Sequence, residues 1–358
     1  MNIAFLINSL HNAGGTERVS TVIANKLSEE GYCVKFFSLH RGEKPFFDIS
    51  PKIDICYLND VPYSNIYVNY LSNMLKIRKL CKINKIDYLI DVCTAMSLMS
   101  IPATIFSHTK VISWEHFNAG INWNPITSPL SRRLVSRFAY KVVVLTNDDK
   151  RIFDSKFKAK NTVVIHNPLT INPSGVVDIG QKVAIAVGRL EHQKGFDILL
   201  YAWSKTKCRA KGWKLRIVGS GSLDSELRDL SLSLGIADSV EFLPATNNIV
   251  SEYLKASVFL LSSRFEGFGL VLVEAMSVGL PIISFDCDNG PRDIVEHNTT
   301  GILVSPLDIE SFSNEIDTLS SDYNLRCELS KNALYSVERF KLEPILQQWK
   351  NILEKEVE

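Results

Sequence analysis

The chain lacks the cysteine and histidine patterns that stabilise small secreted proteins or bind metals. Its seven cysteines are scattered along the sequence, and no two of them form a Cys-x-x-Cys pair. Its seven histidines are equally dispersed. We therefore expect neither a disulfide framework nor a metal site, and a reducing cytoplasm is the simplest location.

Long apolar runs and an excess of charge are also missing. No stretch of the sequence approaches the run of about 18 apolar residues that predicts a transmembrane helix. A formal net charge of +1 creates no general attraction to nucleic acid. No G-x-G-x-x-G motif follows either expected first strand, which argues against a nicotinamide-dependent dehydrogenase.

Short apolar runs alternate with helical patterns through all 358 residues, which is typical of parallel α/β architecture. This length suits two domains, and prolines and glycines between residues 167 and 180 interrupt the alternation. We predict two doubly wound domains, at 1–172 and 181–336, followed by a C-terminal segment at 337–358 that forms a helix.

The expected strands are Ile3–Asn8, Val34–Leu39, Tyr88–Val92, Val111–Trp114, Val142–Leu145 and Val163–His166 in the first half, and Val183–Val187, Leu215–Val218, Val240–Leu243, Val258–Leu261, Ile282–Phe285 and Gly301–Val304 in the second. Helical patterns in the first half include Thr16–Glu30, Val68–Ile83 and Ser131–Tyr140. The last helix is expected at Glu343–Glu354.

The most informative segment is 262–279, which follows an apolar strand pattern and contains two glutamates. Glu266 lies on the expected strand-to-helix turn, beside glycines that let the main chain approach a ligand. Glu274 lies within an apolar helical stretch, where a carboxylate is costly unless it is hydrogen-bonded or neutralised. The start of that helix also presents free N–H groups to an anion. Two carboxylates beside a phosphate-binding helix start are expected for a sugar-nucleotide pocket, although a buried Glu274 neutralised by Arg or Lys is the plain alternative.

Glu266 and Glu274, with seven residues between them, resemble the E-x7-E motif of retaining glycosyltransferases, and the surrounding residues are similar to family 4 of these enzymes. The resemblance implies the GT-B fold, in which two Rossmann-like domains face each other across a cleft and the last helix crosses back to the first domain. It also implies that the donor is bound by the turn that holds Glu266, Gly267, Phe268, Gly269 and Leu270, together with Glu274.

Two further loops follow expected strands of the second domain. The guanidinium of Arg189 is a rigid fork of N–H donors and the ammonium of Lys194 is a point charge, and these are the two usual ligands of a diphosphate. The two residues resemble the Gly-Arg-x5-Lys-Gly pattern of the family. Taken alone, this loop would suit a solvated basic surface equally well. Gly219 lies in a Val-Gly-x-Gly turn that the resemblance places on the nucleotide side.

The first domain supplies two more candidates. Gly14 and Gly15 precede a helix, and the resemblance implies that they approach the donor phosphates, although Thr16 as a helix N-cap explains part of the pattern. His116 ends an expected strand and resembles the active-site histidine of the family, whereas the alternative is a satisfied core histidine. Glu115 points away from His116 if the strand continues.

Two remaining patterns have ordinary alternatives. Asp286 and Asp288 form a D-x-D, but any two aspartates at this spacing match, so we interpret the loop as a wall of the donor-sugar site and expect no metal. The stretch 131–141 carries Arg132, Arg133, Arg137 and Lys141 among apolar residues, which fits either an anionic membrane surface or an ordinary surface helix.

Together these features predict a retaining glycosyltransferase that moves a hexose or N-acetylhexosamine. The resemblance implies a UDP-sugar donor, a polyprenyl-diphosphate-linked saccharide acceptor in O-antigen, capsule or exopolysaccharide synthesis, and a location in the cytoplasm or on the inner face of the membrane. No cofactor and no nucleic acid partner are expected. A UDP-sugar epimerase with the same fold and a non-catalytic sugar-nucleotide-binding protein remain alternatives.

Overall fold

The computed structural model describes residues 1–42, 44–60 and 69–354, which form two units. The first unit contains Met1–Thr170 and the helix that starts at Leu342, and the second contains Ile171–Lys341. The chain passes to the second unit at Ile171, within the region 167–180 where the alternating pattern is interrupted. It returns to the first unit at Leu342, whereas the C-terminal segment is expected from the sequence to begin at residue 337. None of the described helices combines the length and apolar character that a membrane span requires.

The first unit is built on a parallel sheet of seven strands with the order β3-β2-β1-β4-β5-β6-β7. Its strands are β1 (Asn2–Ile7), β2 (Cys33–His40), β3 (Asp54–Asn59), β4 (Tyr88–Asp91), β5 (Lys110–Glu115), β6 (Lys141–Val144) and β7 (Thr162–Val164). Its helices are α1 (Gly15–Glu29), α2 (Tyr70–Ile83), α3 (Ser97–Thr104), α4 (Thr127–Phe138) and α5 (Asn147–Lys156), with α13 (Leu342–Glu354) from the end of the chain.

The second unit contains a parallel sheet of six strands with the order β10-β9-β8-β11-β12-β13. Its strands are β8 (Val183–Val187), β9 (Lys214–Val218), β10 (Val240–Leu243), β11 (Val258–Leu261), β12 (Ile282–Phe285) and β13 (Gly301–Val304). Its helices are α6 (Phe196–Lys205), α7 (Asp224–Ser233), α8 (Ile249–Tyr253), α9 (Leu270–Ser277), α10 (Pro291–Ile294), α11 (Ile309–Ser321) and α12 (Tyr323–Ser336).

Apolar side chains on both faces of each sheet explain why helices cover both faces. In the second unit, one face packs against α6, α7 and α11 in a single core cluster. The opposite face packs against α8 and α9, and α12 packs on α9. A parallel sheet needs this double cover because its strands are buried on both sides. The predicted pair of Rossmann-like domains is confirmed.

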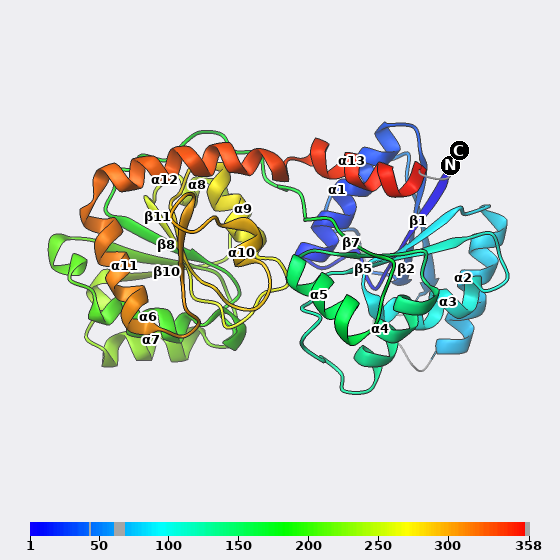
Figure 1. Ribbon diagram of the computed structural model, residues 1–358, viewed down its shortest axis with the longest axis horizontal. Helices are drawn as coiled ribbons and strands as arrows, with labels where there is room; N and C mark the ends of the chain where they lie inside the picture. The colour runs from blue at the N-terminus through cyan, green and yellow to red at the C-terminus, as the bar shows by residue number, and fades with distance from the viewer. Residues whose placement is uncertain (43, 61–68, 355–358) are drawn as a thin grey trace. The chain divides into compact units, whose positions relative to one another are not determined.

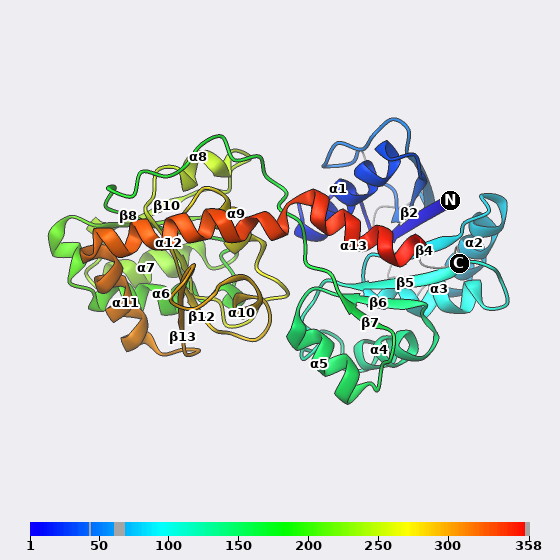
Figure 2. The same cartoon turned by 45° about the horizontal axis from the view of Figure 1, so that its top comes forward.

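The C-terminal helix α13 completes the first unit. It lies beside α1 (Figure 1, and from a second angle Figure 2), and its buried residues are Ile345, Leu346, Trp349, Ile352 and Leu353. Trp349 packs edge-on against Trp114 of β5, with ring centroids 4.6 Å apart. Lys350 pairs with Glu30 just beyond α1, with Nζ 2.8 Å from the carboxylate oxygen.

Several local predictions differ from the structure. The sequence analysis missed β3, because this strand pairs only with β2 at the sheet edge and its half-exposed residues form no apolar run. It also missed α3 and α5. The helix expected from Ser131 begins at Thr127, since Pro129 is tolerated in a first turn. Val68, the expected start of another helix, lies outside the described residues.

Candidate functional site

The second unit has a natural ligand-binding position between β8 and β11. The strand order runs outward in opposite directions from these two neighbours, so the loops after them diverge. In open α/β sheets this switch point, beyond the carboxyl ends of the strands, is where ligands bind. The loop after β8 contains Arg189 and Lys194, and the loop after β11 contains Glu266. The topology therefore brings the two predicted motifs together.

Lys194 and Glu266 form an ion pair at this position. Lys194 Nζ lies 2.7 Å from Glu266 Oε1, and the two side chains are only 15% and 5% exposed. Ser263 donates a second hydrogen bond to the same oxygen at 2.6 Å. A buried carboxylate is tolerated when it is paired and hydrogen-bonded in this way. The cation predicted to meet the donor phosphates thus also neutralises the first glutamate of the motif.

Hydrogen bonds hold the two loops against each other. The amide of Arg264 donates to the carbonyl of Gln193 at 2.8 Å, and the Gln193 side chain donates back to the carbonyl of Phe265 at 3.1 Å. Ser262 Oγ donates to the carbonyl of Lys194 at 2.9 Å. The geometry around the ion pair is therefore fixed by the main chain of both loops rather than by the two charges alone.

The start of α9 lies in the same loop region. Gly269 has φ 92°, a left-handed conformation that glycine adopts without strain, and it serves as the N-cap of α9. Its turn follows Phe268, whose side chain is buried edge-on against Phe340, so that its aromatic ring is a packing element. Gly267 and Leu270 are partly exposed beside it. The predicted helix start is present, with its amides at the carboxyl end of the sheet.

Glu274 lies one helical turn further along α9 and is 5% exposed. Tyr253, at the end of α8, donates its hydroxyl hydrogen bond to Glu274 Oε2 at 3.0 Å. The Tyr253 hydroxyl thus provides this buried carboxylate with a hydrogen bond inside an apolar helix.

The remaining predicted donor residues occupy the neighbouring loops. Gly219 follows β9, and a Cβ at this position would collide with the carbonyl oxygen of Gly188 after β8. Arg189 is exposed, and hydrogen bonds from Ser222 together with the charge of Arg189 lower the pKa of the neighbouring Glu191 carboxyl. Lys194 differs because its charge is paired directly with the buried Glu266.

The D-x-D aspartates differ in their surroundings. Asp286 accepts a two-pronged hydrogen bond from Arg292, at 2.9 and 3.0 Å, while Asp288 is exposed. No group of three or more His, Cys, Asp or Glu that could hold a metal occurs within residues 1–42, 44–60 and 69–354. That activity is independent of a metal stays a prediction, and an experiment in solution tests it.

In the first unit, Gly14 and Gly15 lie at the start of α1, after β1. The N-cap of α1 is Gly14, so the expectation that Thr16 caps this helix is wrong. Glu17 in the first turn lies against Gly14, and burial raises the pKa of its carboxyl. A Cβ at Gly14 would meet the end of the flexible Glu17 side chain, so a larger residue here would require Glu17 to move.

His116 directly follows β5 and is 8% exposed. Its ring packs on Trp114 with centroids 4.3 Å apart, and within the described chain its Nε2 has no hydrogen-bond partner. Burial lowers the pKa of His116 to about 3, so the imidazole is neutral at physiological pH. The buried, unpaired Nε2 distinguishes His116 from a core histidine whose ring nitrogens are both hydrogen-bonded.

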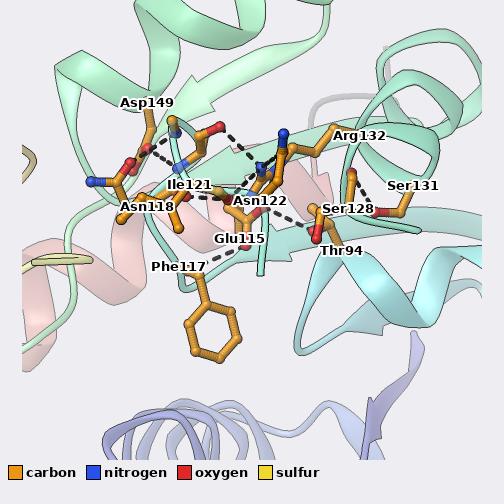
Figure 3. Close-up of polar contacts among 12 residues, drawn as sticks. Thr94, Glu115, Phe117, Asn118, Ile121, Asn122, Ser128, Ser131, Arg132 and Asp149 are labelled. Atoms are coloured by element: carbon orange, nitrogen blue, oxygen red, sulfur yellow. Dashed lines mark hydrogen bonds and ion pairs between the residues drawn. The ribbon is translucent and has the colours of Figure 1, made fainter. Parts of the chain in front are cut away.

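Glu115 is the last residue of β5 and binds Arg132 of α4 (Figure 3). Arg132 Nε lies 3.0 Å from Glu115 Oε2, and the side chains are 2% and 1% exposed. Thr94 donates a further hydrogen bond to the same oxygen at 2.8 Å. The assignment of Arg132 to a surface-exposed basic stretch is therefore wrong. Its spacing of three from the buried Val135 was the available signal.

Sequence reasoning located Lys194, Glu266, Glu274 and His116, but it missed their polar partners. Ser263, Tyr253 and the Glu115–Arg132 pair carry no motif, and only the fold brings them to these positions. Ser263 lies 3 residues from Glu266, Tyr253 lies 21 from Glu274, and Arg132 lies 17 from Glu115.

Comparison with known proteins decides the family. The model described as Glycosyltransferase Family 4 matches residues 13–172, and the model described as Glycosyl transferases group 1 matches residues 171–334. An uncharacterized glycosyltransferase of Haemophilus influenzae is 38% identical over 98% of this chain and 99% of its own. The chain belongs to glycosyltransferase family 4.

A further relative and a solved structure are similar to nearly the whole chain. The amylovoran biosynthesis glycosyltransferase AmsD of Erwinia amylovora is 29% identical, with 98% of this chain and 99% of the relative covered. Among solved structures, HepE from Anabaena in complex with UDP superposes with a TM-score of 0.81 at 20% identity, over 99% of this chain and 100% of that one. The GT-B fold is thus confirmed.

The Lys194–Glu266 pair leads to a first prediction, on stability. Replacing Lys194 by Met should lower the free energy of unfolding by about 3 kcal/mol, because it leaves a buried carboxylate unpaired. Arg189→Met is the matched control, since it removes an exposed cation from the same loop and should change stability by less than about 0.5 kcal/mol. Urea unfolding of both variants measures the difference, and equal stabilities would contradict a buried pair.

A second prediction concerns His116 and pH. Its pKa is lowered in the folded state, so the unfolded state binds this proton first and stability is lost as pH falls below about 6.5. Between pH 7.5 and pH 5 the wild type should lose about 2 kcal/mol more than His116→Gln. Urea titrations at the two pH values provide the test, and parallel losses in both proteins would show that His116 is not buried in its neutral form.

Proposed function

We propose that this glycosyltransferase transfers a sugar from a UDP-sugar to a lipid-linked glycan, with retention of the anomeric configuration. The observation that carries the proposal is the Lys194–Glu266 pair at the switch point between β8 and β11, beside the start of α9. A cation, a helix N-terminus and a carboxylate at one strand end form a site for a negatively charged leaving group attached to a sugar.

Departure of the nucleoside diphosphate is the difficult step, because negative charge develops on its phosphate oxygens while positive charge builds on the anomeric carbon. Arg189 is exposed and its interaction with Glu191 is electrostatic, so it can turn toward a diphosphate, whereas Lys194 has to share its charge with the buried Glu266. Together with the amides of α9 they would stabilise the departing group in the transition state.

The two glutamates take different roles in this proposal. Glu274, buried and held by Tyr253, would accept hydrogen bonds from the ribose hydroxyls. Glu266 would contact the donor sugar or its phosphate side. His116 of the first unit would contact the transferred sugar through its free Nε2. In the front-face mechanism, the acceptor hydroxyl attacks the anomeric carbon on the side that the diphosphate leaves, and its proton passes to the departing phosphate.

The similar proteins support both substrates. The structure of HepE was determined with UDP and with UDP-glucose. A Campylobacter jejuni relative, 29% identical over 99% of this chain and 98% of its own, is named as an N-acetylgalactosaminyltransferase that acts on a saccharide linked to undecaprenyl diphosphate. We infer the same classes of donor and acceptor for this protein.

A donor screen tests the proposal. UDP and at least one UDP-sugar should raise the melting temperature, and NMR should detect slow hydrolysis of that UDP-sugar to a sugar with retained configuration. We expect excess EDTA and Asp286→Ala to leave the rate unchanged, because cations of the chain bind the diphosphate. An epimerised UDP-sugar formed without acceptor would favour the epimerase, and binding without any turnover would favour the non-catalytic alternative.

Variants of the same site make a third prediction. Arg189→Ala and Lys194→Ala should each reduce turnover by about one to two orders of magnitude, the worth of one charge-assisted contact. Glu274→Gln should weaken UDP binding, whereas Glu266→Gln should spare UDP affinity and slow transfer, since contacts at the reacting sugar strengthen in the transition state. Calorimetric UDP titration and single-turnover rates separate these effects. The reverse pattern would exchange the two roles.

We also propose that the exposed side of α4 contacts an anionic membrane, where a lipid-linked acceptor is found. Ile126, Leu130, Arg133 and Arg137 recur every three or four residues and are all exposed, so they share one side of the helix. Trp123 and Phe138 add exposed aromatic rings, 56% and 57% accessible. The segment 116–147 contains no acidic residue. Apolar side chains flanked by arginines suit a negatively charged lipid surface.

A fourth prediction follows for vesicle binding. The protein should sediment with phosphatidylglycerol-containing vesicles more than with pure phosphatidylcholine vesicles. Arg133→Gln/Arg137→Gln should weaken binding roughly 30-fold, at about 1 kcal/mol for each cation. Ile126→Ser/Leu130→Ser should also weaken it. Phe106→Ser is the control, since this residue of the same unit is 96% exposed but lies outside α4. Equal loss in the control would refute a specific membrane surface.

A further inference from the structure

Arg132 and Glu115 are an unusual pair because both charges are almost fully buried within the first unit. Taking two charges out of water is expensive, and an apolar pair of similar volume is often at least as stable. Stability alone therefore does not account for this pair. Glu115 is the residue before His116, and Arg132 is on α4, so the pair joins this helix to the chain next to a candidate site residue.

Arg132 contacts much more than the carboxylate. Its guanidinium donates hydrogen bonds to the carbonyls of Asn118, Ala119 and Ile121 at 3.2, 3.0 and 3.0 Å, and to the Asn122 side chain at 3.3 Å (Figure 3). All four acceptors belong to the loop that immediately follows His116. The fork geometry of arginine allows this number of simultaneous contacts, which a lysine cannot make.

Further contacts hold the same loop from other directions. The Phe117 amide donates to Glu115 Oε1 at 3.2 Å, and the Ala119 amide donates to Asp149 Oδ1 at 2.8 Å. Asp149 is itself fully buried at the start of α5 and is held by Thr146. The loop 117–122 is thus fixed by buried charged groups on two helices, although it has no regular secondary structure of its own.

We propose that Arg132 is a positioning residue, which holds the loop 117–122 and thereby sets the direction of the His116 ring. The inference rests on the proposed role of His116 at the transferred sugar. The ring of His116 packs on Trp114, and no hydrogen bond to Nε2 is described that could orient it. Its orientation therefore depends on the main chain that follows it, which Arg132 holds.

Three variants separate positioning from simple stabilisation. Arg132→Met leaves Glu115 buried and unpaired, so the melting temperature should fall by roughly 10 °C. In Glu115→Gln/Arg132→Met neither charge remains, and most of this loss should be recovered. The double variant still lacks the four loop contacts, so we expect kcat of donor hydrolysis to stay about 10- to 100-fold low, with UDP affinity unchanged. Arg78→Met is the control and should behave as the wild type, since Arg78 is an exposed arginine on α2 of the same unit.

Arg132→Lys provides a test that does not require the double variant to fold well. It retains a positive charge beside Glu115 but cannot reach all four loop acceptors. We expect a folded protein in which the amides of 117–122 exchange hydrogen at least tenfold faster and kcat falls about tenfold. Hydrogen exchange needs no substrate, so this arm reports on the loop even if sugar transfer is disproved.

The outcomes are distinct. If the double variant regains both stability and kcat, or if Arg132→Lys keeps slow exchange and full kcat, the pair is only a fold element and the proposal is wrong. If the wild type neither binds UDP nor hydrolyses a UDP-sugar, the proposed function fails instead. If His116→Gln has full activity while the Arg132 variants are slow, the loop acts by another route and His116 is not what Arg132 positions.

Discussion

The reversal of strand order beside the first strand of each sheet is the constraint on which the rest of the structure depends. The loop after β8 leads toward β9 on one side, and the loop after β11 leads toward β12 on the other, so the two loops diverge. Polar residues on these loops can then line a ligand site beyond the strand ends. A buried parallel sheet offers few other places for charge. The glycosyltransferase motifs follow from this geometry, because residues 72 positions apart meet at one strand end.

Both units place a buried carboxylate beside a cation, but with different consequences. Lys194 is a point charge on a flexible stem, and its partner Glu266 sits on a glycine-rich turn, so a phosphate can compete for it. Arg132 is a planar fork that is saturated by carbonyl oxygens, and nothing in its contacts is left for a ligand. Lys194 can therefore exchange Glu266 for a phosphate oxygen, whereas the Arg132–Glu115 pair keeps the loop 117–122 in one conformation.

The sequence alone allowed the fold class, nearly all strands and the principal charged residues to be predicted. The apolar runs of the second unit predicted its strands well, since each one is covered on both faces. The edge strand β3 lacks this double cover and gave no comparable signal. The partners of Glu274 and Glu266 escaped prediction for another reason: a tyrosine or serine becomes a partner only through tertiary contact. Arg132 was assigned to the surface because its charge was given more weight than its spacing of three residues from the buried Val135.

The return of α13 to the first unit has a consequence for the order in which the chain folds. Domains generally fold as they leave the ribosome, starting from the N-terminus. Here the first unit lacks a helix until residues 342–354 are synthesised, and Trp114 stays without the ring of Trp349 beside it. The strand that ends beside His116 therefore has an incomplete apolar cover throughout the synthesis of the second unit. A chain that stops before Leu342 would expose this surface to chaperones and proteases.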